Sequence, residues 1–349
     1  MNIFENRIIQ ITLMPVSLVY GLIIRCRNFF YDYGLFSTKK ISGCKIICVG
    51  NISVGGTGKT PVVKFLAGYL NQRGFNVAIL SRGYGRKSKG TVVVSDGKNT
   101  LANLEDSGDE PLLLANQLKT IPVIVEADRV KGAQFILKQF VSDVILLDDA
   151  YQHRRIFRDI NIVLIDASRG FGRNYLLPSG FLREPVSSLK RADLVLFTRV
   201  DSTENIEQLQ KITRQNTSCP QVTSSHVPAM LIRMTNNQKF DLAFLKDKKV
   251  LLFSGIANQT SFQQVVKKLG ATVVFHEEFP DHFFYTPKDI KNIITRFRST
   301  NCDLILTTEK DYYRLVSLVS DYDFFYYLTI EISIINGFDN LAEKLASIF

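Results

Sequence analysis

The stretch KIICVGNISVGGTGKTPVVKFLAGYL, residues 45–70, decides the fold of this chain. It joins an apolar, strand-like run at 45–49 to a glycine-rich turn and then to a helical pattern that begins near Lys59. Strand, turn and helix in this order are typical of the phosphate-binding loop, or P-loop, of nucleotide-binding α/β proteins. The sequence therefore predicts a site for the phosphates of ATP at residues 50–60.

The composition of this loop fits phosphate binding. Glycines let backbone N–H groups approach phosphate oxygens, and the N-terminus of the following helix favours anions. Lys59 is expected to reach the β- and γ-phosphates, and the Thr60 hydroxyl to bind Mg²⁺. The strict motif has a glycine where this chain has Ser53, so the prediction depends on the strand, turn and helix context. The residues expected to contact the nucleotide are Gly55, Gly56, Thr57, Gly58, Lys59 and Thr60.

Apolar runs and helical patterns alternate around the loop. Strands are expected at 77–80, 92–95, 123–125, 144–147, 162–165 and 194–198, and helices at 61–73, 110–118 and 127–140. Several of these runs are almost wholly apolar, as strands buried on both faces of a parallel sheet are. The pattern predicts an α/β fold, a P-loop NTPase-like doubly wound sheet with ligands at the carboxyl ends of its strands.

A second, smaller α/β domain is expected after residue 248. The chain has 349 residues, enough for two domains with a core each. Segments 223–235 and 324–334 read as strands, and we expect them to pair as a ribbon between the domains. The expected divisions are a membrane-associated helix at 1–27, a P-loop domain at 28–220, a linker ribbon at 221–247 and the smaller domain at 248–349.

Two acidic residues, Asp148 and Asp149, follow the strand predicted at 144–147. A carboxylate at a strand end beside a P-loop binds Mg²⁺ directly or through water in many nucleotide-binding proteins. A solvated acidic pair is the alternative. With the P-loop upstream, the pattern favours a magnesium site that includes Thr60, Asp148 and Asp149.

The overall charge favours anionic partners. The chain carries 43 lysines and arginines against 33 acidic residues, a formal net charge of +10. Such a balance suits nucleotides, phosphorylated lipids or an anionic membrane surface, and no module typical of nucleic-acid binding is present in the sequence. The five cysteines form no CxxC pair, which argues against a disulfide framework and a structural zinc site.

An uncharged, mostly apolar run of 17 residues extends from Ile8 to Ile24. This length is at the lower limit for a membrane-spanning helix. Cationic and aromatic side chains follow at once, in RCRNFFYDY (25–33), and such residues favour headgroup depth. We expect a helix that lies in or dips into the membrane interface; a helix packed on the first domain is the alternative.

Seven dispersed motifs together resemble the tetraacyldisaccharide 4′-kinase family, the lipid A 4′-kinases. They are GNISVGGTGKTP (50–61), SRGYGRK (81–87), SGDEP (107–111), DDAYQHRR (148–155), LPSGFLREP (177–185), FPDHFFY (279–285) and TTEKD (307–311). The matches are in the expected order from near the N-terminus almost to the C-terminus. Where the family often has DDGFQH, this chain has alanine at position 150 and tyrosine at 151.

The resemblance implies transfer of the ATP γ-phosphate to the 4′-hydroxyl of lipid A disaccharide 1-phosphate at the cytoplasmic face of the inner membrane. It implies that Asp109 assists deprotonation of the sugar hydroxyl, with His282 as its partner and Lys59 on the phosphates. It also implies that the smaller domain closes over the active site. From the residues alone, Asp109 reads as a helix N-cap and His282 as a loop histidine. Candidate substrate contacts are Arg82, Tyr84, Arg183 and Glu184.

A membrane-associated P-loop ATPase of the partition or localisation type is the main alternative. Those proteins have a second lysine at the start of the loop, where this chain has Val54. The hypothesis that the chain is a GTPase has less support, because the segment Thr198–Asp201 resembles the guanine-reading motif only in its last residue.

Overall fold

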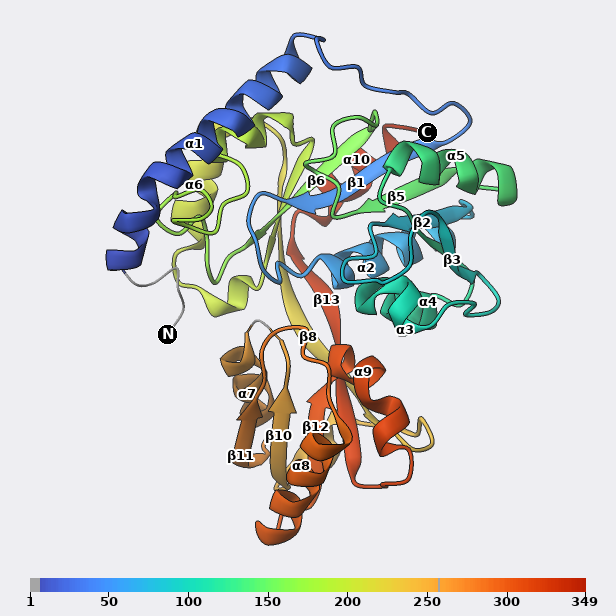
Figure 1. Cartoon of the computed structure of the whole chain (residues 1–349), viewed down its shortest axis with the longest axis vertical. Helices are drawn as coiled ribbons and strands as arrows, with labels where there is room; N and C mark the ends of the chain where they lie inside the picture. The colour runs from blue at the N-terminus through green and yellow to red at the C-terminus, as the bar shows by residue number, and fades with distance from the viewer. Residues whose placement is uncertain (1–6, 257) are drawn as a thin grey trace. The chain divides into compact units, whose positions relative to one another are not determined.

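The computed structural model describes residues 7–256 and 258–349 and has an α/β fold (Figure 1). The chain divides into two compact units. Unit 1 comprises the chain up to Ser107 together with Leu114–His226 and Ile332–Phe349. Unit 2 comprises Gly108–Leu113 and Val227–Glu331. Each unit is described by itself below.

Unit 1 is built on a mainly parallel sheet. Its strands are β1 (Lys45–Asn51), β2 (Val77–Ser81), β3 (Val92–Asp96), β4 (Pro122–Val125), β5 (Val144–Asp148), β6 (Ile160–Asp166), β7 (Leu194–Thr198) and the start of β8 (Gln221–Arg233). Their order is β8-β7-β6-β1-β5-β2-β4-β3. Only β3 runs antiparallel to its neighbour among the described pairs of this sheet. The carboxyl ends of β1, β5 and β6 therefore meet at one edge.

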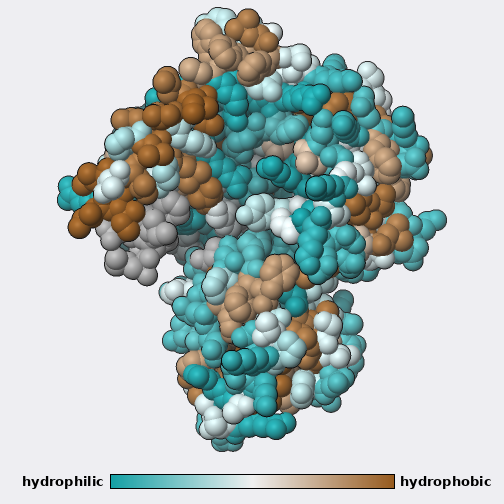
Figure 2. Space-filling view, in the orientation of Figure 1, coloured by the Kyte–Doolittle hydropathy of each residue, from teal (hydrophilic) through white to brown (hydrophobic). Residues whose placement is uncertain are grey.

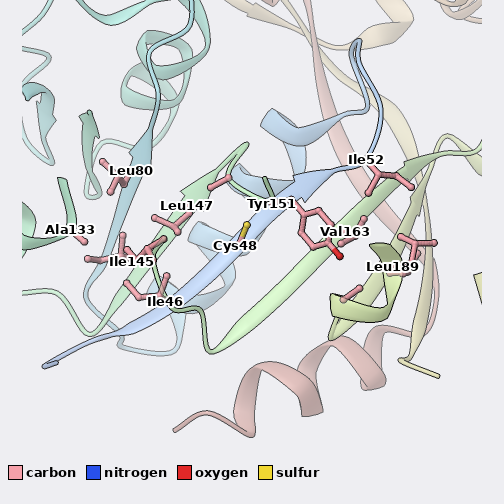
Figure 3. Close-up of a cluster of buried hydrophobic side chains, with 14 of the residues drawn as sticks. Ile46, Cys48, Ile52, Leu80, Ala133, Ile145, Leu147, Tyr151, Val163 and Leu189 are labelled. Carbon is pink, nitrogen blue, oxygen red and sulfur yellow. The ribbon is translucent and has the colours of Figure 1, made fainter. Parts of the chain in front are cut away.

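Helices cover this sheet and complete unit 1. They are α1 (Arg7–Asp32), α2 (Lys59–Gln72), α3 (Leu104–Ser107), α5 (Arg129–Gln139), α6 (Ile206–Asn216), α10 (Phe338–Ala346), the end of α4 (Asp109–Gln117), and the 3-10 helices η2 (Val186–Arg191) and η3 (Val200–Ser202). Ile46 and Cys48 of β1 pack in one buried cluster with Ala133 of α5 (Figure 3). Ile47 and Val49 alternate to the opposite face.

The strand that carries the P-loop is packed closely against the segment after β5. A Cβ atom at Gly50 would lie 2.7 Å from Cβ of Tyr151, so only glycine allows this approach. The Tyr151 ring is buried in the cluster of Figure 3, and its hydroxyl donates to the Ser188 carbonyl at 2.6 Å. Tyr151, at a position where the family that the chain resembles often has phenylalanine, thus has a partner for its hydroxyl.

Unit 2 contains a smaller α/β layer. The strands β10 (Lys249–Ser254), β11 (Thr272–Glu278) and β12 (Leu304–Thr308) are parallel, and β13 (Phe325–Asn336) and β8 follow in the order β11-β10-β12-β13-β8; β9 (Lys239–Phe240) pairs with β8. Its helices are α7 (Gln259–Lys268), α8 (Pro287–Ser299), α9 (Glu309–Val319) and the 3-10 helix η4 (Leu242–Leu245). Leu251 and Phe253 pack in one buried cluster, and Val250 and Leu252 in another.

The structure confirms the predicted α/β sheet and most predicted strands to within two residues. The two segments expected to form a ribbon, β8 and β13, are neighbours in the sheet, and the chain passes between the units along both. Helix α6 was not predicted, and the edge strand β3 is antiparallel rather than parallel. Residues 1–6 of the expected N-terminal helix lie outside the described residues.

Candidate active site

The P-loop connects β1 to α2 in unit 1. Gly55 and Gly58 have φ angles of +99° and +81°, in the left-handed region that favours glycine. The side chains of Lys59 and Thr60 are buried at the start of α2. The Asn51 side-chain amide donates to the Thr57 hydroxyl at 2.8 Å and fixes the middle of the loop.

Three carbonyl groups of the loop accept hydrogen bonds from side chains outside it. Arg169 Nη1 donates to the Val54 carbonyl at 3.1 Å. Arg199 Nη1 donates to the Gly56 carbonyl at 2.7 Å, and Thr198 Oγ1 donates to the Thr57 carbonyl at 3.0 Å. Arg199 is also ion-paired with Asp166 at the end of β6. Sequence reasoning did not predict these contacts, because the side chains follow strands that are distant in sequence from the loop.

The acidic pair lies beside the loop, where β5 ends. Asp148 is buried, next to Val49 of β1, and its carboxylate accepts from the Ser81 hydroxyl at 3.0 Å. Asp149 has a φ of +48°. Its carboxylate receives Nη1 of Arg183 at 3.0 and 3.1 Å, and Lys59 Nζ lies 3.7 Å away. The start of α2 and the segment at residue 183 thus bring Lys59 and Arg183 to the Asp149 carboxylate, while the neighbouring Asp148 carboxylate is held by Ser81.

Two neighbouring positive charges keep the Asp149 carboxylate ionised. Burial raises the pKa of its carboxyl, but the charges of Lys59 and Arg183 outweigh burial and hold the pKa below its ordinary value. Among the described residues, no group of three or more His, Cys, Asp or Glu side chains could hold a metal alone. Mg²⁺ is usually bound by one or two carboxylates together with substrate phosphates, so the Thr60 hydroxyl and the two carboxylates fit a Mg²⁺–nucleotide site.

A second cluster of charged residues lies in unit 2. His282, with a φ of +61°, has its Nδ1 at 2.8 Å from Oδ2 of Asp109, the first residue of α4. The same carboxylate oxygen accepts a hydrogen bond from Nη2 of Arg314. The His282 side chain is 35% exposed and that of Asp109 11%, so the imidazole is the more accessible partner.

Arg314 is itself held by a buried network. Its Nη1 contacts the Gly255 carbonyl and Asp311 Oδ1, both at 3.2 Å. Asp311 in turn accepts hydrogen bonds from the Tyr285 hydroxyl at 2.9 Å and the Thr308 hydroxyl at 2.7 Å. The network joins the ends of β10 and β12 to the Asp109 carboxylate. Sequence reasoning did not identify Arg314, although it lies one helical turn after the TTEKD motif.

The pKa values of Asp109 and His282 are shifted in opposite directions. Burial raises the pKa of the Asp109 carboxyl, but the hydrogen bond with His282 and the charges of Arg314 and Lys310 hold that pKa well below its usual range. The hydrogen bond to Asp109 raises the pKa of His282, and this outweighs the opposite effect of burial. Asp109 is therefore an ionised acceptor, and His282 is the group that titrates closer to neutral pH.

The four candidate substrate contacts are in different surroundings. Arg82 and Tyr84 are exposed after the end of β2, and the Tyr84 side chain is 75% exposed. Arg183 is paired with Asp149. Glu184 is fully buried and accepts from Arg27, Asn28 and Arg191. A fully buried and fully engaged carboxylate is a structural anchor, so the expected substrate contact at Glu184 is not supported.

Helix α1 presents a side of mixed polar and apolar residues to the rest of unit 1 and a largely apolar side to solvent. Figure 2 shows hydrophobic side chains gathered along this helix. The exposed large apolar residues of α1 are Ile8, Ile11, Val16, Leu18, Val19, Leu22, Ile23, Phe29 and Phe30. By length and composition α1 could cross a membrane, and it is the one such helix among the described residues. The helix packs on the first domain, as the alternative expectation has it, and its exposed apolar side is compatible with the expected position at a membrane interface.

Comparison with known proteins identifies the family. A model of the tetraacyldisaccharide-1-P 4′-kinases matches residues 9–349. The chain belongs to this family. Relatives named tetraacyldisaccharide 4′-kinase include those of Syntrophus aciditrophicus (38% identity; 86% of this chain, 83% of that protein) and Chlorobaculum parvum (35%; 99% and 96%).

A solved structure agrees with this assignment along the chain. The crystal structure of LpxK from Aquifex aeolicus in complex with ATP is 34% identical and superposes with a TM-score of 0.79, covering 97% of this chain and 99% of that one. The kinase family, rather than a partition-type ATPase, therefore accounts for the P-loop of this protein.

Proposed function

We propose that this protein is a tetraacyldisaccharide 4′-kinase that transfers the γ-phosphate of ATP to the 4′-hydroxyl of lipid A disaccharide 1-phosphate. The observation that carries the proposal is family membership along almost the whole chain, combined with a P-loop and an Asp–His pair in the described residues. A P-loop alone supports ATP binding. A proton acceptor for a hydroxyl is the additional feature that a kinase needs.

We assign the proton transfer to His282 and its orientation to Asp109. The resemblance implied that Asp109 assists deprotonation, but a carboxylate that accepts from both Arg314 and His282 is weakly basic. When Asp109 binds the Nδ1–H of His282, the neutral imidazole presents Nε2 as its proton acceptor. The 4′-hydroxyl then loses its proton to Nε2, its oxygen forms a bond to the γ-phosphorus, and the bond from that phosphorus to the β-γ bridging oxygen breaks to release ADP.

The P-loop is proposed to bind ATP, the phosphate donor. Lys59 is suited to bind the β- and γ-phosphates, and Thr60, Asp148 and Asp149 are suited to hold Mg²⁺. Mg²⁺ would neutralise charge on the phosphate oxygens. Lys59 and Arg183 are both paired with Asp149, so two positive charges lie beside the P-loop.

The protein is proposed to act at the inner membrane, on its cytoplasmic face, through α1. A helix that docks along one side and exposes apolar residues along the other suits an interfacial position. The excess of basic residues adds attraction to an anionic surface. The expectation that residues 248–349 close over the active site remains a prediction.

The direct test is phosphate transfer with purified protein. Labelled ATP, Mg²⁺ and lipid A disaccharide 1-phosphate are incubated in detergent, and the lipid is separated and counted. We expect label on the lipid, and a loss of about 10²–10⁴-fold in rate for His282→Ala. ATP hydrolysis without any labelled lipid would contradict the kinase assignment.

A further inference from the structure

A strap formed by residues 176–184 lies between helix α1 and the P-loop in unit 1. Its end runs beside the loop: Arg183 N–H donates to the Ile52 carbonyl at 2.7 Å, and Val54 N–H donates to the Phe181 carbonyl at 2.8 Å. Ser53 and Leu182 form an antiparallel bridge between these contacts. The strap therefore fixes the three residues that lead into the P-loop glycines.

The strap also supplies a side chain to the acidic pair. Arg183 binds both oxygens of Asp149, at 3.0 and 3.1 Å. Both contacts come from one nitrogen, Nη1, so Arg183 places a positive charge against both oxygens of the Asp149 carboxylate. Any movement of the strap therefore moves the partner of Asp149, the proposed metal-binding carboxylate.

The opposite side of the strap is held by α1. Ser17 donates to the carbonyls of Leu176 and Leu177, and the Tyr20 hydroxyl donates to the Arg183 carbonyl at 2.8 Å. A Cβ atom at Gly21 would lie 2.8 Å from Leu176 Cδ1, so this part of α1 lies close to the Leu176 side chain. The inner side of α1 is thus built to contact the strap closely.

The strongest attachment is at the last residue of the strap. Glu184 is buried, and Asn28 Nδ2 and Arg27 Nη2 of α1 donate to its two carboxylate oxygens at 2.8 and 3.3 Å. Arg191 also donates to Glu184, so loss of the Asn28 amide would remove one hydrogen bond to a buried carboxylate that stays paired with arginine. The membrane-facing helix is therefore tied, through two consecutive strap residues, to the nucleotide site.

We propose that α1 is part of the nucleotide site and not only an anchor: Tyr20 and Asn28 are positioning residues that act through the strap on Arg183, Asp149 and the entry of the P-loop. This inference rests on the proposed function, since it assumes that the P-loop binds Mg²⁺ and ATP. It goes further by giving separate roles to the two sides of one helix. The outer side contacts lipid, and the inner side sets the site for a soluble ligand.

The test measures Mg²⁺–ATP binding by calorimetry in detergent without lipid substrate. The double variant Tyr20→Phe/Asn28→Ala is expected to bind Mg²⁺–ATP about 10–100-fold more weakly, from the loss of one neutral and one charged hydrogen bond. Its sedimentation with vesicles is expected to remain that of wild type, because the outer side of α1 is unchanged. Thr12→Val is the matched control, since its hydroxyl is exposed and bonds only to the Ile8 carbonyl of the same helix.

A second comparison distinguishes a positioning role of Tyr20 and Asn28 from a purely structural one. Binding is repeated with EDTA in place of Mg²⁺; if Asp149 is displaced, the gain in affinity on adding Mg²⁺ is smaller in the double variant than in wild type. Unchanged Mg²⁺–ATP affinity, or an unchanged magnesium effect, would overturn the inference. If the double variant does not fold, Tyr20→Phe alone must weaken binding about 2–10-fold. Failure of wild type to bind ATP would instead contradict the proposed function.

Discussion

A single carboxylate oxygen, Oδ2 of Asp109, accepts from both a histidine and an arginine. The hydrogen bond from Arg314 makes the Asp109 carboxylate a weak base. The Asp109 carboxylate in turn makes the imidazole of His282 more basic. The raised pKa of His282 means that the imidazole loses its proton, and becomes able to accept one, only as pH rises through that value. Activity should therefore increase with pH on the acidic side of the profile.

Replacement of Asp109 by asparagine tests this division of roles. The substitution removes the charged hydrogen-bond acceptor that raises the pKa of His282, so the acidic limb of the kcat/KM profile should move to lower pH. The maximal rate should fall by about 10²–10⁴-fold, because the imidazole loses its orientation. Steady-state kinetics across pH give both results. Glu105→Gln, at an exposed ion pair with Lys87, is the control; an acidic limb that stays in place in Asp109→Asn would show that His282 is not the titrating base.

The P-loop illustrates how one backbone position can determine an element. An alanine Cβ at Gly58 would lie 2.5 Å from Nε2 of His226, in a backbone conformation that L side chains rarely adopt. We expect Gly58→Ala to abolish measurable ATP binding. Ten residues further on, Gly68 lies within α2 with no atom within 4 Å of an added Cβ.

Gly68→Ala is thus a matched control for Gly58→Ala. It should raise the free energy of unfolding by about 0.5–1 kcal/mol, since alanine favours a helix more than glycine does. Calorimetric ATP binding and thermal unfolding of the two variants measure both effects. Retained ATP affinity in Gly58→Ala would mean that the loop does not need this conformation.

Helix α1 is the element through which we propose that the protein contacts a membrane. Leu18 and Leu22 are 66% and 61% exposed on its outer side. Leu18→Gln/Leu22→Gln should reduce sedimentation with anionic vesicles at least tenfold, because burial of two leucine side chains contributes about 1.5–3 kcal/mol each. Leu101→Gln/Val141→Gln changes exposed apolar residues elsewhere in unit 1 and should sediment as wild type does. Equal loss in both pairs would point to general surface hydrophobicity instead of α1.

The elements differ in how far sequence could predict them. The strands of the parallel sheet are apolar runs between turn signals, and the loop at 50–60 has a glycine pattern, so both were accessible from local sequence. Arg314 could not be identified from local sequence, because its role depends on contacts with residues far away in the chain, Asp109 among them. The burial of Glu184 was not accessible from local sequence for the same reason, because its partners Arg27 and Asn28 are far away in the chain.

At the scale of the whole molecule, net charge should add to the apolar contact with membranes. The formal charge of +10 predicts stronger binding to anionic than to zwitterionic vesicles. Salt shortens the range of this attraction, to roughly 3 Å at 1 M from about 10 Å at 0.1 M, so the difference between the two vesicle types should shrink as salt is added. Vesicle sedimentation across a salt series measures it; equal binding to both vesicle types at low salt would contradict an electrostatic contribution.

The central claim is that the whole molecule places a second phosphate on the 4′-oxygen of a lipid A disaccharide 1-phosphate. The most direct measurement is phosphorus NMR together with mass spectrometry of the lipid product formed by wild type and by His282→Ala. The account predicts one added phosphate monoester at the 4′ position with wild type and almost none with the variant. A phosphate added at another position, or equal product from the two proteins, would contradict it.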